Sequence, residues 1–143
     1  MPCHTRVQEF FDFYQELDKN STPRLADFYH QDAIFEDPLH RIVGVPALVR
    51  YFDGLYAGVE SIQFHFAAPV IQADRVWVDW RMVYQHRRLQ KGQPIEVEGA
   101  SRLDWQDDQV LHHRDYFDAG QLLYQHLPLM GWAIKQLKQR MAV

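Results

Sequence analysis

The stretch on which the expected fold and the expected site both depend runs from Val110 to Asp118 and reads VLHHRDYFD. It begins with strand-like residues and leads directly into a helical segment, so charged and aromatic side chains collect where an extended element ends. Alternate side chains of a strand share one face. If the strand persists to Phe117, His113 and Asp115 therefore point the same way as its ring. On the inner face of a curved sheet, this arrangement predicts an imidazole and a carboxylate in an apolar pocket, which is a proton-transfer site.

The same stretch also has a purely structural interpretation. Arg114 can pair with Asp115 or Asp118 on the surface. Asp118 can also N-cap the helix that follows, with Gln121 three residues later as its capping-box partner. Both interpretations stay open at the level of the sequence.

The first third of the chain has the apolar spacing of helices, with one short strand among them. Apolar residues recur about every 3.6 residues after Thr5, Thr22-Pro23 has the pattern of a helix start, and Gly58 has the pattern of a helix end. The expected elements are a helix at 5–19, a short helix from Thr22, a turn at 30–32, a strand at 33–37, a loop at 39–44 and a helix from Val45 to Gly58.

From Ile62 onward the apolar period changes to about 2, which is typical of strands. Helices segregated from hairpin-linked strands indicate an α+β fold. We expect a curved antiparallel sheet wrapped around the N-terminal helices, with a pocket between them, and a C-terminal helical tail interrupted near Pro128. The expected strands are 62–66, 76–85, 95–105 and 110–117, and the tail is 119–143.

The composition excludes several classes of protein. A chain of 143 residues is expected to form one domain, residues 1–143, and a hydrophobic content of 47% excludes a disordered protein. A net charge of −4 argues against a nucleic-acid partner. A single cysteine, Cys3, excludes an internal disulfide framework, so we expect a reducing compartment and a cytoplasmic location. We expect no signal peptide and no membrane-spanning segment.

This order of elements resembles the nuclear transport factor 2-like (cystatin-like) fold, in which a curved sheet surrounds a conical cavity. Ketosteroid isomerases, limonene epoxide hydrolase, scytalone dehydratase and the SnoaL-like polyketide cyclases share it. The resemblance extends to about Leu123, and its sharpest local match is the segment from Arg114 to Asp118. It implies a homodimer, a small hydrophobic ligand and no cofactor.

Epoxide hydrolases of the limonene type can be compared residue by residue. The first Asp of their matching segment is a pocket carboxylate that helps to activate water, and Asp115 is its match. Phe35 and Asp37 stand where those enzymes carry a Tyr and an Asn, and Trp77 and Asp79 stand where they carry the ends of an Arg-x-Asp pair. Only Asp79 and Asp115 keep the residue type. The chain therefore departs from that mechanism, and the SnoaL-like proteins are the nearer likeness.

Three carboxylates, Asp37, Asp79 and Asp115, are thus expected to converge on one pocket. An apolar cavity disfavours the charged form of a carboxylate, and crowded carboxylates oppose one another's ionisation. One acid can then donate a proton while its neighbour accepts one. We expect Asp115 to act as general base or acid, Asp37 to be the second acid, and His113 to orient Asp115.

Each of these residues also has a structural alternative. Asp37 precedes Pro38 and can simply cap a turn. Asp79 can be a solvated partner of Arg81 on an outer face. The side chains expected to bind the substrate are Phe35, Tyr56, Phe64, Trp80 and Tyr116.

Other catalytic sites have weaker patterns. The chain has eight histidines but no His-x-x-x-His pair on an expected helix, so no metal site is expected. Ser101 lacks the Gly-x-Ser-x-Gly turn of a nucleophilic serine.

We therefore expect a small-molecule-binding protein, an isomerase, cyclase or hydrolase that moves protons with carboxylates on a small hydrophobic carbonyl or hydroxyl compound. One alternative is a non-catalytic ligand-binding or protein-interaction module of the same fold. Another is a peripheral membrane protein that binds through its apolar and basic tail. The tail could equally pack on its own domain, pack across a dimer or close over the pocket.

Overall fold

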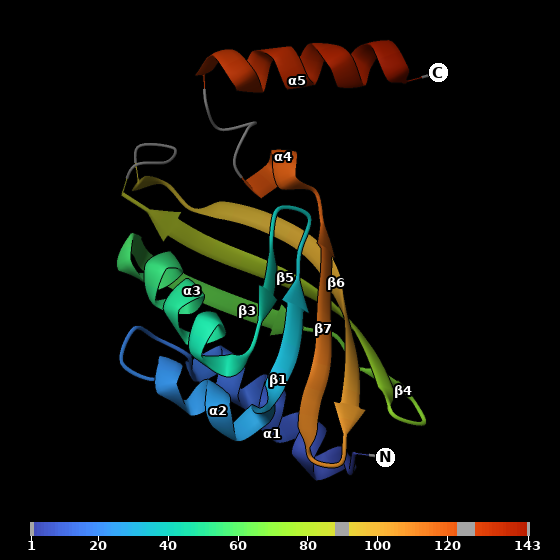
Figure 1. Ribbon diagram of the computed structural model, residues 1–143. Coiled ribbons are helices and arrows are strands. Elements are labelled where there is room, and N and C mark those ends of the chain that lie inside the picture. Colours follow the sequence, from blue (N-terminus) through green and yellow to red (C-terminus); the bar gives the residue numbers. More distant parts are fainter. Residues whose placement is uncertain (1, 88–91, 123–127, 143) are drawn as a thin grey trace.

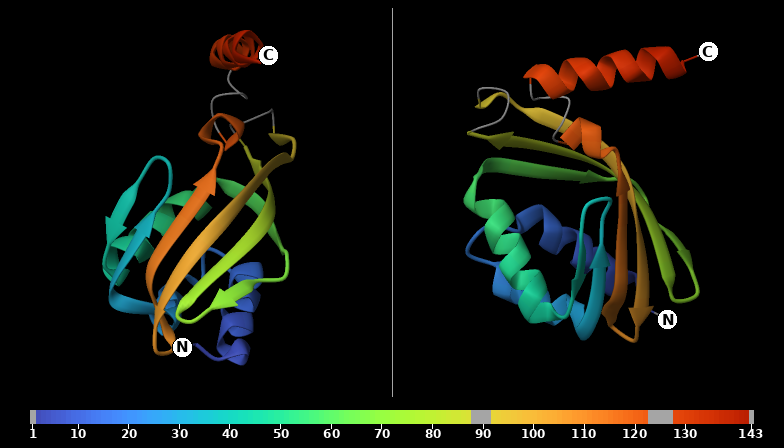
Figure 2. Two further views of the ribbon diagram at one scale, coloured as in Figure 1. Left: turned by 90° about the vertical axis from the view of Figure 1, so that its right-hand side faces the viewer. Right: turned by 45° about the horizontal axis from the view of Figure 1, so that its top comes forward.

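The fold is a curved sheet with helices on its concave side (Figures 1 and 2). The computed structural model describes residues 2–87, 92–122 and 128–142. The helices are α1 (His4–Glu16), the 3-10 helix η1 (Thr22–Arg24), α2 (Leu25–Phe28), α3 (Val45–Ala57), α4 (Ala119–Leu122) and α5 (Pro128–Met141). The strands are β1 (Tyr29–Glu36), β2 (Arg41–Val43), β3 (Val59–Phe66), β4 (Val70–Gln72), β5 (Arg75–His86), β6 (Ile95–Gln106) and β7 (Gln109–Phe117).

The strands form one sheet in the order β2-β1-β7-β6-β5-β3, and β4 pairs with β5. The pairs β3–β5, β5–β6 and β6–β7 are antiparallel, whereas β1 and β7 run parallel. The expected α+β class and curved sheet are therefore confirmed. The sheet is mixed rather than purely antiparallel because β1 enters it from the helical half of the chain.

Two local predictions in that half are wrong. Residues 30–32 are extended instead of forming a turn, and β2 occupies part of the expected loop at 39–44. Tyr29 is buried, and its hydroxyl is hydrogen-bonded inside the core. Burial of this ring holds the backbone in the sheet directly after α2. The register of β1 against β7 shifts between Tyr29 and Ile34, at the polar residues that resemble a turn in the sequence.

The core is largely aromatic because the helices meet the sheet through rings. Phe10 of α1 lies 5.7 Å from Trp105 of β6, measured between ring centroids, and Phe13 stacks on Phe28 at 4.7 Å. Burying one such side chain contributes about 1.5–3 kcal/mol. The high aromatic content of the chain therefore stabilises the fold as well as lining its cavity.

The tail helix α5 lies apart from this core, beyond α4 (Figure 1). Trp132 is 62% exposed, and Leu137 and Met141 are exposed as well. Lys138 pairs with Asp118 at 2.9 Å. The described apolar side chains of the tail thus do not pack on the chain's own domain, which was one of the expectations for it.

Gly99 of β6 is required by the close approach of an indole ring. It lies opposite Trp80 of β5 in the sheet. A Cβ atom at this position would lie 2.5 Å from two indole carbons of Trp80 and 2.7 Å from the backbone oxygen of Tyr116. By contrast, Gly54 of α3 has open space around the same position. Only the first glycine is therefore fixed by packing.

We predict that Gly99→Ala lowers the free energy of unfolding by about 1–3 kcal/mol, because the added methyl group must displace the indole ring or the backbone. Gly54→Ala is the matched control and should raise the free energy of unfolding by about 0.5–1 kcal/mol through helix propensity. Urea unfolding followed by circular dichroism measures both. A Gly99→Ala variant as stable as the parent would contradict this account of β6.

Candidate functional site

An apolar cavity of about 170 Å³ lies between the concave face of the sheet and helices α1 and α3. Aromatic rings dominate its wall. Two carboxylates, Asp37 and Asp115, interrupt this wall together with Ser101 and His113. The aromatic residues that line it are Phe10, Phe11, Tyr14, Phe35, Tyr51, Phe52, Tyr56, Phe64, Phe66, Trp80, Tyr84 and Phe117. Most of the cavity surface can therefore bind only apolar parts of a ligand.

Asp115 of β7 is held at the wall through one of its two oxygens. Its Oδ1 accepts hydrogen bonds from Ser101 Oγ and from His113 Nε2, the latter at 2.6 Å. Ser101 lies opposite Asp115 in the β6–β7 register and in turn accepts a hydrogen bond from Trp80 Nε1 at 2.8 Å. The Asp115 side chain is 18% exposed, and no described group donates to its Oδ2. One oxygen is thus fixed, and the other is left for a ligand.

His113 links this carboxylate to two buried tyrosines. Its Nδ1 lies 2.7 Å from the hydroxyl of Tyr29, which lies 2.6 Å from the hydroxyl of Tyr14. Burial raises the pKa of both tyrosines, so both hydroxyls keep their protons. Because a carboxylate only accepts, a neutral His113 donates through Nε2–H to Asp115 and accepts at Nδ1 from Tyr29. Tyr29 then accepts a hydrogen bond from Tyr14. The hydrogens of this row of hydrogen bonds, from Tyr14 through Tyr29 and His113, therefore all point toward Asp115.

Asp37 directly follows β1 and is surrounded by donors. Its Oδ1 accepts from the backbone N–H groups of Leu39 at 2.8 Å and His40 at 2.7 Å, and His40 Nδ1 lies 3.1 Å from the same oxygen. Its Oδ2 accepts from the Tyr51 hydroxyl at 3.0 Å. Burial, followed by the charges of Asp37 and Asp115, raises the pKa of Tyr51. Asp37 therefore caps the turn before β2, as its structural alternative expected, and fixes Tyr51 at the cavity wall.

The structure corrects the expectation that Asp79 reaches the pocket. Val78 and Trp80 of β5 are buried and line the cavity, so strand alternation turns Asp79 to the outer face, where it is exposed. The predicted meeting of three carboxylates is therefore reduced to Asp37 and Asp115.

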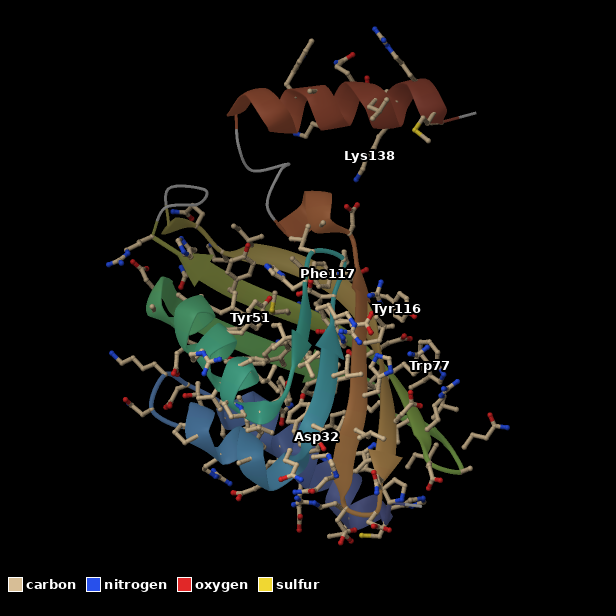
Figure 3. All side chains as sticks on the ribbon, viewed as in Figure 1. Asp32, Tyr51, Trp77, Tyr116, Phe117 and Lys138 are labelled. Atoms are coloured by element: carbon tan, nitrogen blue, oxygen red, sulfur yellow. The ribbon has the colours of Figure 1, made fainter. Side chains whose placement is uncertain are left out.

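The structure also corrects the expectation that Tyr116 binds the substrate, because this residue lies on the outer face and does not line the cavity. It is 43% exposed and stacks on Trp77, with ring centroids 6.0 Å apart. The Arg114 guanidinium lies 5.0 Å from the centroid of the same ring. Figure 3 shows Trp77 and Tyr116 together at the side of the sheet away from the helices. The other four expected pocket walls, Phe35, Tyr56, Phe64 and Trp80, do line the cavity.

The charged residues beside Asp115 have their own partners. Arg114 pairs with Glu36 at 3.1 Å rather than with either of the aspartates beside it. Asp118 accepts a hydrogen bond from the backbone N–H of Gly120 at 2.8 Å, which is the capping contact expected at the start of α4. The structural interpretation of this stretch therefore holds for Asp118, whereas Asp115 points into the cavity.

Sequence reasoning missed four polar residues of the site: Ser101 as a donor, and Tyr14, Tyr29 and Tyr51. Ser101 could have been found from strand parity, because Leu103 shares its face and is fully buried. Tyr29 had no local signal, since its partner His113 is 84 residues away.

Within the part of the chain that the structure describes, no three His, Cys, Asp or Glu side chains are grouped so that they could hold a metal ion. No helix in that part is long and apolar enough to cross a membrane. The polar groups of the residues around the cavity are carboxylates, hydroxyls, one imidazole and the indole N–H of Trp80.

Solved structures with the same fold are distant in sequence. A protein with a ketosteroid isomerase-like fold from Catenulispora acidiphila, in complex with trimethylamine, is 14% identical with a TM-score of 0.72 and covers 88% of this chain and 94% of its own. TsrD from Streptomyces laurentii is 13% identical with a TM-score of 0.72, and the match covers 85% of this chain and 95% of TsrD. An NTF2-like protein of unknown function from Burkholderia pseudomallei is 9% identical with a TM-score of 0.72, and the match covers 83% of this chain and 92% of that protein. At these identities the likeness shows the fold alone.

No curated protein matches this sequence. The SnoaL-like domain family matches residues 7–113, which include most of α1, all of α3, His113 and all of the sheet except the end of β7. That match covers well over half of the chain, and it agrees with the fold of the solved structures. The chain therefore belongs to the family of SnoaL-like domain proteins.

Proposed function

We propose that this protein binds a small hydrophobic carbonyl or hydroxyl compound and moves a proton on it, with Asp115 as general base. The observation that carries the proposal is the asymmetry of this carboxylate. Ser101 and His113 hold Oδ1, whereas no described side chain donates to Oδ2 on the wall of an apolar cavity. A base held through one oxygen keeps its geometry while the other oxygen receives a proton.

The proposal gives Asp37 a different role from the second acid expected earlier. Donors already point at both of its oxygens, and they include two backbone N–H groups that cannot reorient. A proton on Oδ1 would point at these fixed N–H groups, and a proton on Oδ2 would require Tyr51 to turn its own hydrogen away from Asp37. We therefore assign Asp37 to positioning Tyr51.

A non-catalytic binding protein is the second candidate, and it is favoured by the dominance of aromatic side chains in the cavity wall.

A homodimer also remains a proposal, supported by the exposed Trp77 and Tyr116 on the outer face. Binding to a membrane surface through α5 is supported only by the exposed Trp132, Leu137 and Met141. A cytoplasmic location and a single domain over residues 1–143 remain proposals from the sequence.

Asp115→Asn keeps the size of the side chain and removes its basic oxygen. With 2-hydroxy-1-indanone, a bicyclic hydroxyketone, as probe in D2O, the parent protein should accelerate exchange of the proton next to the carbonyl group. The variant should lose about a hundredfold or more of that rate, because general base catalysis contributes about 10²–10⁴. Proton NMR measures the exchange.

Asp79→Asn is the matched control, since it makes the same change on the outer face, and it should exchange at the rate of the parent. Circular dichroism checks that both variants fold. Equal rates in Asp115→Asn and the parent would remove Asp115 from the mechanism, and no acceleration by the parent would favour the binding protein.

Tyr29→Phe should lower both stability and exchange rate. The change leaves His113 Nδ1 and the Tyr14 hydroxyl without their buried partner, which costs about 1–3 kcal/mol in the free energy of unfolding. It also removes the contact that fixes the imidazole, so the exchange rate should lie between those of the parent and Asp115→Asn. Urea unfolding and the exchange assay measure the two effects. Tyr116→Phe, on the outer face, serves as the control, and a Tyr29→Phe rate equal to that control would refute the positioning role.

A further inference from the structure

The acidic side chains of the cavity wall are not balanced by a lysine or an arginine of the wall. Among the described residues that line it, Asp37 and Asp115 are acidic, and none is Lys or Arg. The nearest arginine in sequence, Arg114, pairs with Glu36. Any complementary hydrogens or positive charge for a ligand site must therefore come from polar side chains of the wall or from the ligand itself.

The hydroxyl hydrogens next to Asp115 are already used. Ser101 has one hydrogen, and it is donated to Asp115 Oδ1. The Trp80 N–H is donated to Ser101. With His113 neutral, the hydrogens of Tyr29 and Tyr14 follow one direction toward His113, so Tyr14 presents only an oxygen lone pair to the cavity.

The hydrogen of Tyr51 is used in the same way. It is donated to Asp37 Oδ2 at 3.0 Å, which leaves the phenolic oxygen of Tyr51 as an acceptor at the wall. The hydroxyl of Tyr56 is buried and has no partner among the described residues, but it is enclosed by protein atoms. Tyr84 also lines the cavity, but Asp115 is not among the groups that shift the pKa of its hydroxyl, as it is for Tyr14 and Tyr51. The polar groups near Asp115 that are positioned for a ligand are therefore Asp115 Oδ2 and the oxygens of Tyr51 and Tyr14, and all three accept.

We infer that the ligand is a hydrophobic molecule that carries a hydrogen-bond donor, a hydroxyl or an ammonium group, which it directs at Asp115 Oδ2. This inference rests on the proposed function and narrows its substrate class. A compound whose only polar atom is a carbonyl or ether oxygen is disfavoured, because the lone pairs of that oxygen would face the lone pairs of Asp115 Oδ2. A site built to hydrogen-bond a hydroxyl group discriminates strongly against analogues that lack it, since its buried polar atoms are then left unpaired. An ammonium group would in addition neutralise the carboxylate and contact the faces of the aromatic rings.

Three naphthalene probes of similar shape test the inference by isothermal titration calorimetry: 2-naphthol, 2-(aminomethyl)naphthalene and 2-methoxynaphthalene. The first two donate a hydrogen bond as a hydroxyl and as an ammonium group, and the third only accepts. The better of the two donors should bind the parent protein about tenfold to a hundredfold more tightly than the ether. The extra methyl group of the ether adds apolar surface, so hydrophobic burial alone would favour the opposite order.

Asp115→Asn gives a sharper outcome, because the preference for donor probes should disappear. The asparagine oxygen keeps the hydrogen bonds from Ser101 and His113, so its NH2 group takes the place of Oδ2 and offers hydrogens to the ligand. The ammonium probe should then bind less tightly than the ether, and 2-naphthol, whose hydroxyl oxygen can also accept a hydrogen bond, should lose its advantage over the ether. Asp79→Asn is the matched control and should keep the parent order of affinities.

The relative affinity of the two donor probes identifies which donor the site takes, and either result supports the inference. Equal affinity of the parent for donors and ether, tighter binding of the ether, or no binding of any probe would overturn it. The ratio of the affinities of the parent protein for the donor probes and for the ether is measured without any variant. A failure of Asp115→Asn to fold therefore leaves the test intact. Proton exchange without donor preference would refute only this inference, whereas donor preference without exchange would refute only the proposed proton transfer.

Discussion

The pairing of β6 with β7 is the constraint on which the site depends. Ser101 faces Asp115 across these strands, and His113 reaches the same carboxylate oxygen from two residues earlier on β7. A shift of the register by one residue would turn every side chain of the moved strand to the opposite face. The carboxylate would then lose its Ser101 donor, and, if β6 were the moved strand, the serine would also lose its contact with Trp80. The geometry of the site is therefore a property of the sheet as a whole rather than of a loop.

The same alternation separates the two faces of the sheet. On β5, Val76, Val78 and Trp80 are buried, whereas Trp77 and Asp79 between them are exposed. Inward residues form the cavity and the core, and outward residues carry charge and the stacked aromatic pair. This two-sided pattern is typical of sheets with one solvated face. It explains how two neighbouring residues of β7 meet such different surroundings.

Much of this could be predicted from the sequence, because it follows from local periodicity. The long strands, the helix after Val45 and the inward direction of His113 and Asp115 all follow from spacing. The family likeness predicts Asp79 in the pocket, whereas the alternation of its neighbours Val78 and Trp80, which are buried, turns it outward. Tyr29 and the parallel pairing of β1 could not be predicted, since a polar stretch after a short helix resembles a turn and its partners are distant in the chain. The pairing and register of strands that are distant in the chain are the part that a single sequence does not specify.

The two carboxylates of the cavity differ in how many of their oxygens already accept hydrogen bonds from the protein. This difference distinguishes a structural carboxylate from one that can react with a ligand. Asp37 is nearly enclosed, with a 6% exposed side chain, and its oxygens are held by backbone and side-chain donors. Such a group stabilises a turn and gains nothing further from a ligand. Among the described residues, Asp115 has donors on one oxygen only, although it lies in an apolar wall where an unpaired polar atom is unfavourable. Natural folds keep such an unsatisfied group mainly where function requires it. The asymmetry of Asp115, rather than the number of acids near the cavity, is therefore the strongest indication of where a ligand binds.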